Sequence, residues 1–294
     1  MSFSSRVKDE LCRVKNARPC CLRAELYGSL LLAGTFRPHE IRLITEHNGL
    51  AARLPGLLRQ VFGLDWDQAE PRGKWILSLH SPDKSAAVWN AFCFGQTQAL
   101  HLNNAVLEGE CCPAAFFRGA FLSGGTVTDP DKTYHLQLTT THYHLVRELT
   151  SLFLECGLSP GHTAREGVYA LYFKASESIE DFLTLIGAPS AALALMEAKV
   201  EKDLRNHINR RVNCETANLG KAVGAAMAQC EAFHRLRSGP LWDDLPQTLK
   251  DTVERRLLYP EYTLEELAAT FDPPLGRSGL NHRLRKLMGL GQPG

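Results

Sequence analysis

The sequence lacks several features that would place it in a familiar class. No apolar run approaches the length that crosses a bilayer, and the first residues are polar and charged, so we expect neither a membrane protein nor a secretory signal peptide. The net charge is only +1 over 294 residues, which argues against a protein that coats nucleic acid regardless of sequence. Any binding to DNA must therefore come from local patches of charge.

Metal-binding spacing is also absent. The nine cysteines include no C-x-x-C pair, and an odd number of them suits reduced thiols in a cytosolic protein. A zinc site built from His207, Cys214 and Cys230 is conceivable, but its spacing matches no usual zinc finger. We expect a cytoplasmic protein with no bound metal and no cofactor.

What the sequence does contain is a long internal repeat. Residues 20–36 return 91 positions later as residues 111–127, and a fixed offset of that length is far too long for a solenoid. The repeat implies two similar halves packed about a pseudo-twofold axis. The identical pairs are Cys20/Cys111, Cys21/Cys112, Ala24/Ala115, Gly28/Gly119, Leu31/Leu122, Gly34/Gly125 and Thr35/Thr126.

The elements after each copy repeat as well, at an offset of about 94. Alternating apolar residues predict half-buried strands, and helical stretches are closed by a glycine. The predicted pairs are strands at 41–45 and 136–140, helices at 50–62 and 144–156, strands at 75–79 and 169–173, and helices at 85–94 and 178–186. A further strand is expected in the gaps at 37–40 and 128–134.

The two repeated lead helices have an unusual number of small residues. Glycine costs about 1 kcal/mol relative to alanine in a helix interior, so something must compensate. Small residues let two helix backbones approach closely. A simpler alternative is that these are only helix ends, but two copies at one offset favour packing at the axis. The residues predicted to pack there are Gly28, Ala33, Gly34, Gly119, Gly124 and Gly125.

Residues 26–36 and 117–127 resemble, in spacing, the LAGLIDADG motif of the homing endonucleases. The resemblance implies a duplicated αββαββα domain that lays a saddle-shaped sheet on DNA, with an acidic residue before the last glycine of each motif holding a divalent metal. Here those positions are Ala33 and Gly124. Metal-assisted hydrolysis needs oxygen ligands. Asp129 and Asp131 are better explained as turn residues, so we predict a protein that is not an enzyme.

The last third of the chain carries a second signal. Residues 263–266, Thr-Leu-Glu-Glu, form a capping box that begins a helix ending at Phe271, before Asp-Pro-Pro. A second helix is predicted from Arg277 to Met288, with an apolar stripe at Leu280, Leu284 and Leu287. This arrangement is typical of a helix-turn-helix whose second helix enters the major groove.

Positive charge in the last third of the chain is concentrated in one predicted helix. Residues 223–294 hold nine basic and nine acidic residues, yet the predicted second helix is basic and contains no acid. A basic last turn that complements the helix dipole would explain Arg285 and Lys286 but not Arg277. We therefore predict DNA contact by this helix. The predicted contact residues are Arg277, Ser278, Asn281, His282, Arg283, Arg285 and Lys286.

Between the two signals lies a basic connector, residues 199–222, that lacks the Gly-, Ser- and Pro-rich composition of a flexible linker. We expect a structured joint, helical at least to Asn209. It either fixes the two domains or contacts a phosphate backbone through Arg205, Arg210 and Arg211.

Three separated segments resemble the WhiA family of bacterial sporulation and cell-division regulators: residues 4–11, 209–218 and 275–287. The resemblance implies an α+β fold, with a duplicated αββαββα LAGLIDADG-like domain at 1–198 (copies at about 20–95 and 111–187) and an all-α helix-turn-helix domain at 223–294. It implies a regulator of transcription that binds double-stranded DNA without cutting it, in cell division, chromosome segregation or sporulation, and that is associated with the nucleoid.

Two alternatives stay open. In the first, the LAGLIDADG-like domain serves as a scaffold for a transcription or cell-division protein. In the second, the protein is a metal-dependent DNA endonuclease, and the missing acids count against this alternative. If the saddle does contact DNA, it would do so through polar residues of its sheet face. These are His135, His142, His144, Arg42, Lys74, Lys132 and Lys174.

Overall fold

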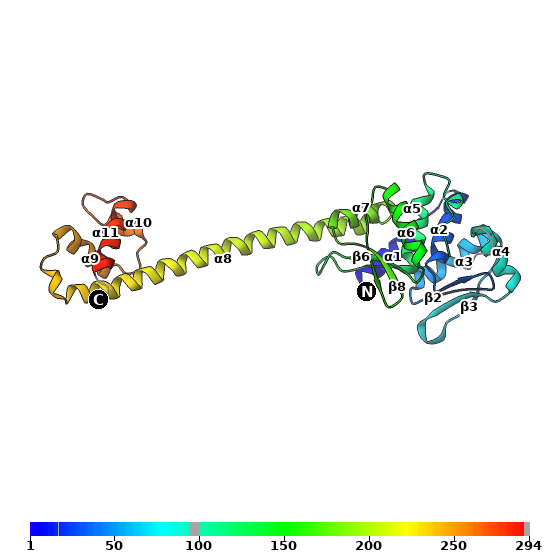
Figure 1. Cartoon of the computed structure of the whole chain (residues 1–294), viewed down its shortest axis with the longest axis horizontal. Coiled ribbons are helices and arrows are strands. Elements are labelled where there is room, and N and C mark those ends of the chain that lie inside the picture. Colours follow the sequence, from blue (N-terminus) through cyan, green and yellow to red (C-terminus); the bar gives the residue numbers. More distant parts are fainter. Residues whose placement is uncertain (17, 94–99, 291–294) are drawn as a thin grey trace. The chain divides into compact units, whose positions relative to one another are not determined.

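The computed structural model describes residues 1–16, 18–93 and 100–290 (Figure 1). The last residue of the helix predicted at 85–94, and the last four of the C-terminal domain, lie outside the described residues. The chain divides into two compact units, Met1–Asp203 and Leu204–Gly294. Among the described residues, no helix combines the length and the apolar character that crossing a membrane requires.

The first half of the first unit begins with α1 (Phe3–Arg13) and continues with the first copy of the repeat. Its four strands pair antiparallel in the order β1-β2-β4-β3, with Leu43 opposite Leu77 at the centre. The elements of the copy are α2 (Pro19–Leu31), β1 (Thr35–Arg37), β2 (Glu40–Thr45), α3 (Asn48–Phe62), β3 (Asp67–Ala69), η1 (Pro71–Gly73), β4 (Trp75–Leu79) and α4 (Pro82–Phe92).

After η2 (Asn104–Val106) the second copy repeats this order, and its sheet has the matching arrangement β5-β6-β8-β7. The duplicated αββαββα fold predicted from the sequence is therefore confirmed. The elements are α5 (Cys112–Gly124), β5 (Gly125–Val127), β6 (Leu136–Thr140), α6 (Tyr143–Glu155), β7 (Gly161–Arg165), β8 (Val168–Phe173) and α7 (Ser176–Ile186).

The first strand of each copy lies earlier than predicted. Strand β1 begins at Thr35 and β5 at Gly125, directly after the lead helices, whereas the gaps at 37–40 and 128–134 contain the turns of the two hairpins. Pro38 and the Asp129-Pro130-Asp131 sequence have the composition of turns, so they cannot continue a strand.

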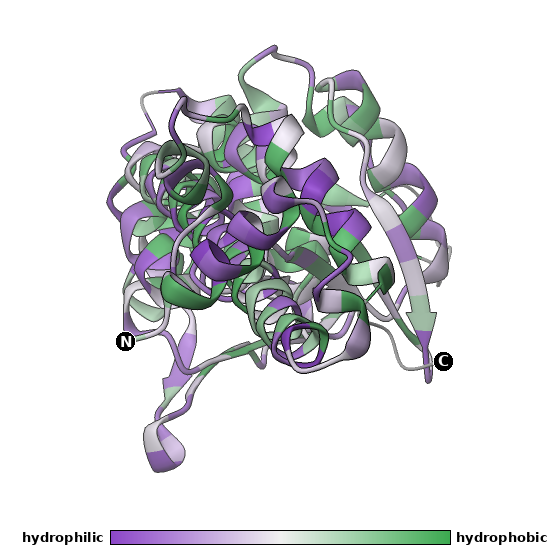
Figure 2. Ribbon diagram, turned by 90° about the vertical axis from the view of Figure 1, so that its left-hand side faces the viewer, coloured by the Kyte–Doolittle hydropathy of each residue, from purple (hydrophilic) through white to green (hydrophobic). Residues whose placement is uncertain are grey.

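One hydrophobic core joins both copies, and the lead helices α2 and α5 run through it side by side (Figure 1). Most other helices are amphipathic, with hydrophobic and hydrophilic residues alternating along each ribbon (Figure 2). In the second copy the core contains an aromatic cluster, where the ring centroids of Phe117 and Phe153 stack at 4.0 Å and both rings contact Phe182.

The second unit is entirely helical. It contains the end of α8 (Pro189–Arg237), η3 (Pro240–Trp242), α9 (Gln247–Leu258), α10 (Leu264–Ala269) and α11 (Arg277–Leu290). Leucines 280, 284 and 287 of α11 are fully buried against Val253, Leu267 and Phe233, as the predicted apolar stripe requires.

The predicted boundaries of the connector do not coincide with breaks in structure. Helix α8 runs without interruption through residues 199–222, well beyond Asn209, and the division between the units falls after Asp203. Residues 199–222 contain no proline, and an isolated glycine such as Gly220 lowers helix stability without ending the helix.

Candidate nucleic-acid interface

The lead helices meet at two glycines. A β-carbon added to Gly28 would lie 2.1 Å from the carbonyl oxygen of Phe116, and one added to Gly119 would lie 2.0 Å from the carbonyl oxygen of Glu25. Both neighbours are backbone atoms, which cannot rotate away. Glycine is therefore required at these two positions, and its cost in helix stability is offset by the close contact of α2 with α5.

The other four small residues have different surroundings. A β-carbon at Gly124 would lie 3.1 Å from the side chain of Leu32, so this glycine also faces the other copy. Ala33 lies just beyond the end of α2 and is half-buried against the core. The assignment of Gly34 to the axis was wrong, because Gly34 has open space around it, in the turn before β1. The three atoms nearest to a β-carbon added at Gly125 belong to Phe121 of the preceding helix, α5.

The axis also holds a buried cluster of charges that the repeat does not predict. The carboxylate of Glu25 is fully buried and accepts hydrogen bonds from Arg118 (Nε to Oε2, 3.0 Å) and from Arg53 of α3 (Nη2 to Oε2, 2.9 Å). Arg118 also donates to the carbonyl oxygen of Ile186 and to Asn16. This cluster ties α2, α3 and α5 together. The only indication of this cluster in the sequence is the presence of charged residues within the apolar lead helices.

The LAGLIDADG resemblance implies a metal-binding acid near the end of each lead helix, but neither position is acidic. The residues at these positions are Ala33, just after α2, and Gly124, the last residue of α5. Asp129 accepts a hydrogen bond from the backbone N–H of Asp131 (3.1 Å), as expected for a turn residue. Within the described part of the chain, no group of three or more His, Asp or Glu side chains gathers closely enough to share an ion.

Two of the four cations predicted on the sheet faces lie beside carboxylates. Lys74 contacts Glu46 at 2.9 Å and Arg42 lies 3.9 Å from Glu40. Exposed pairs of this kind contribute little to stability, but each carboxylate reduces the positive potential that would attract a phosphate. In the second copy the ring of His135 stacks on Tyr172, and Lys174 lies 5.0 Å from the centroid of the same ring.

In the second unit, a capping box and a buried arginine position the first helix of the predicted helix-turn-helix. The capping box is present: Thr263 accepts from the backbone N–H of Glu266 (3.3 Å), and Glu266 accepts from the backbone N–H of Thr263 (2.8 Å). The second of these bonds lowers the pKa of Glu266. Arg256, which is buried, donates to the carbonyl oxygen of Tyr262 (2.8 Å) and so holds the loop that leads into α10. No local pattern in the sequence indicates this role for Arg256.

Four of the seven predicted contact residues form one exposed side of α11. Their spacing of three or four residues places them together, opposite the buried leucines. We call this set the α11 face, which consists of Ser278, His282, Arg285 and Lys286.

Arg277 and Asn281 lie beside a cavity of about 420 Å³, which is also lined by Ala222 and Gln229 of α8. Arg277 is exposed, and its guanidinium lies 3.3 Å from the carboxylate of Glu265 in α10. The positive charge at the start of α11 is therefore partly offset, which the count of charges within the helix alone did not show.

Arg283 was assigned to DNA contact, and the structure instead turns it toward the protein. Its guanidinium donates to the carbonyl oxygen of Thr248 in α9 (3.4 Å) and lies 5.8 Å from the centroid of the Phe271 ring. It is one residue before Leu284, so its direction follows from the burial of that leucine.

The three connector arginines, Arg205, Arg210 and Arg211, are exposed on α8, and Arg211 pairs with Glu215 one turn later (3.0 Å). The same helix excludes the zinc site considered above. At a rise of 1.5 Å per residue, Cys214 and Cys230 are separated by about 24 Å along α8, too far to share an ion.

Comparison with known proteins agrees with the division of the chain into two units. The family model described as the WhiA C-terminal HTH domain matches residues 208–290, and the one described as the WhiA LAGLIDADG-like domain matches residues 113–205. A "Probable cell division protein WhiA" from Ruminiclostridium cellulolyticum is 36% identical over 301 residues, covering 98% of this chain and 96% of that protein. A protein of the same description from Alkaliphilus metalliredigens is 34% identical, with the same coverage.

Among solved structures, the full-length DUF199/WhiA from Thermatoga maritima matches with a TM-score of 0.59 at 19% identity, covering 99% of this chain and 98% of that one. Fold and site together define a protein in which a LAGLIDADG-like domain, without acids at the two motif positions, is joined to a helix-turn-helix domain. The relatives match it over nearly their whole length. The chain belongs to the WhiA family.

Proposed function

We propose that this chain is a regulator that binds double-stranded DNA through α11 and does not cut it. The observation that supports this most strongly is the α11 face, where two cations, a histidine and a serine are exposed on a helix held by a buried leucine stripe. Cations and hydroxyl groups in this arrangement suit contact with phosphates and base edges in a major groove.

The biological setting follows from the family. Its relatives are named as cell division proteins, and we place this chain in the cytoplasm, at the nucleoid, where it regulates transcription of genes for cell division, chromosome segregation or, in a spore former, sporulation. Arg205, Arg210 and Arg211 of α8 add further phosphate contacts in this proposal.

The first prediction concerns binding. Replacing Arg285 by alanine is expected to weaken DNA binding without unfolding the second unit, because this side chain is exposed. A lost base contact costs about 1–3 kcal/mol at one position of the site, whereas a lost phosphate contact weakens all sequences alike and lowers the salt slope by about one. Fluorescence anisotropy of labelled duplexes at several salt concentrations distinguishes the two cases.

Two control variants complete this experiment. Leu284→Ala empties part of the core and is expected to destabilise the second unit by about 2–5 kcal/mol. Arg237→Ala removes another exposed cation, at the end of α8, and is expected to leave both affinity and melting temperature near the parent values. Equal loss of affinity in Arg237→Ala and Arg285→Ala would show a general charge effect rather than a contact made by α11.

The second prediction concerns catalysis. Because Ala33 and Gly124 offer no oxygen ligand from their side chains, we expect no cleavage of plasmid or linear DNA with Mg²⁺ or Mn²⁺, at any protein concentration that saturates binding. Gel electrophoresis of supercoiled plasmid detects a single nick. Reproducible metal-dependent nicking that co-purifies with the protein, and that is lost in Asp129→Asn or Asp131→Asn, would overturn this prediction.

A second role is favoured by the first sheet. Arg42 and Lys74 lie beside carboxylates, and Ile44, the last residue but one of β2, is 51% exposed. A face on which two cations are offset by carboxylates and an apolar side chain is exposed suits a protein better than a phosphate backbone. We propose that this face binds a transcription or cell-division protein while α11 binds DNA. Ile44→Asp would then reduce capture of that protein and leave DNA affinity unchanged.

A further inference from the structure

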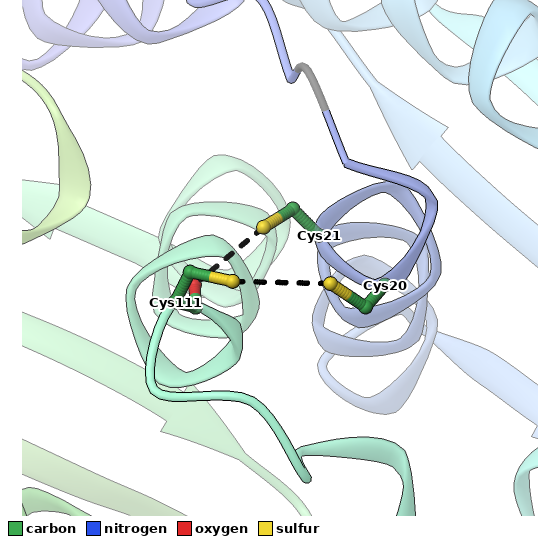
Figure 3. Close-up of side chains that lie close together, drawn as sticks. All are labelled: Cys20, Cys21 and Cys111. Atoms are coloured by element: carbon green, nitrogen blue, oxygen red, sulfur yellow. Dashed lines mark hydrogen bonds between the residues drawn. The ribbon is translucent and has the colours of Figure 1, made fainter.

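Three cysteines meet at the beginning of the two lead helices. Cys20 and Cys21 lie in the first turn of α2, and Cys111 is the residue before α5 (Figure 3). The Sγ atoms of Cys20 and Cys111 are 3.8 Å apart, and all three Sγ atoms lie within 4.8 Å of one another. In the described residues this is the one group of three or more metal-ligating side chains gathered so closely.

These distances match the stereochemistry of a thiolate-bound ion. A Zn–S bond is about 2.3 Å, so the edge of a ZnS₄ tetrahedron is about 3.8 Å. The separation between Cys20 and Cys111 already equals that edge, and the third sulfur atom needs to move by no more than about 1 Å. A disulfide would require the same two sulfur atoms to approach to about 2.05 Å, which is a much larger change.

The charges around the three cysteines favour a divalent ion. The guanidinium of Arg18 lies 3.5 Å from the Sγ atom of Cys111, and the positive ends of two helix dipoles face the group. Three thiolates with one Zn²⁺ carry a net charge of −1, which Arg18 balances, whereas a monovalent ion would leave −2.

We propose that Cys20, Cys21 and Cys111 form a binding site for a soft divalent cation, Zn²⁺ in particular, with water as the fourth ligand. Each coordinated thiol gives up its proton to solvent as its sulfur binds the ion. Cys20 is exposed, so the ion can enter from solvent. The bound ion would fasten the two copies of the repeat together at one end of the axis.

The spacing of cysteines along the chain does not reveal this site. The expectation of no metal considered neighbours in sequence, whereas Cys20 and Cys111 are 91 residues apart and meet only because the repeat folds about an axis. The site lies at the beginning of α2 and α5, in the first unit. Metal binding there can therefore be tested independently of DNA binding by α11.

Metal titration of the full reduced chain is the test. After removal of metal, Zn²⁺ is added in competition with a coloured chelator, and Co²⁺ is added separately as a spectroscopic probe. We expect one equivalent of Zn²⁺, release of protons in an unbuffered titration, and a Co²⁺ spectrum with the thiolate charge-transfer band and intense visible bands of tetrahedral sulfur coordination. Cys20→Ser and Cys111→Ser should each lower Zn²⁺ affinity by more than about tenfold, since loss of even an outer partner costs roughly 10–100-fold.

Cys214→Ser is the matched control, because Cys214 is exposed like Cys20 but lies on α8. It should bind Zn²⁺ like the parent, and melting curves without metal should show that all three serine variants are folded. The proposal is overturned if the reduced chain binds no Zn²⁺, if Cys214→Ser lowers the affinity as much as Cys20→Ser does, or if Co²⁺ gives only the weak bands of oxygen coordination. Formation of a Cys20–Cys111 disulfide in air, without Zn²⁺ affinity after reduction, would also overturn it.

Discussion

Replacing Glu25 by alanine is expected to lower the free energy of unfolding of the first unit by about 3–5 kcal/mol. The carboxylate is fully buried and accepts from Arg53 and Arg118, whose side chains are only 13% and 8% exposed. Without it, two guanidinium groups would remain in the core with no opposite charge. Three of the four tryptophans lie in the first unit, so the change in tryptophan fluorescence on urea unfolding mainly measures this unit.

Glu197→Ala is the control, because it removes an exposed carboxylate from the same unit. It should change stability by less than about 0.5 kcal/mol. Glu25→Gln separates charge from shape, since it keeps an acceptor oxygen but loses the negative charge, and it should fall between alanine and the parent. If Glu25→Ala unfolds at the same urea concentration as Glu197→Ala, the cluster does not hold the axis together.

The largest effect of a single added carbon atom is expected at Gly119. An alanine there would place its β-carbon 2.0 Å from the carbonyl oxygen of Glu25, so α2 and α5 must separate. Overpacking typically costs about 1–3 kcal/mol, and we expect the upper end or more because a backbone atom blocks the site. For a unit of this size, each kcal/mol lowers the melting temperature by roughly 2–4 °C.

Gly56→Ala is the matched control for Gly119→Ala. Gly56 lies in the interior of α3, is exposed, and has nothing within 4 Å of an added β-carbon. Alanine should therefore stabilise the first unit by up to about 1 kcal/mol through helix propensity alone. The two glycine variants are expected to shift the melting temperature in opposite directions. A shift of the same sign in both would contradict a close contact at Gly119.

The architecture of the first unit could be predicted because its sequence pattern occurs in two copies. Repeated glycines, apolar alternation and helix stops each appear in both copies. A pattern that could arise by chance in one copy is therefore supported when it recurs in the other. The helix-turn-helix was predictable for a different reason: the capping box and the leucine stripe are local patterns, and local patterns depend little on distant contacts.

What could not be predicted depends on contacts between distant residues. Glu25 and Arg118 are 93 positions apart and pair only after α2 and α5 have packed. The direction of Arg283 depends on where α9 lies, and the pairing of Arg277 with Glu265 depends on the angle between α10 and α11. Gly34 was assigned to the axis because the repeat includes it, although α2 ends three residues earlier.

DNA binding by α11 is tested most directly by the affinity of the full chain for duplex DNA when two exposed cations of α11 are removed. The variant carries Arg277→Ala and Arg285→Ala together, and it is compared with the parent and with Arg237→Ala by mobility shift in the presence of Mg²⁺. We predict that the parent and Arg237→Ala shift the DNA and leave it intact, whereas the double variant melts like the parent but binds at least tenfold more weakly. Binding by the double variant equal to that of the parent would show that α11 does not bind the DNA.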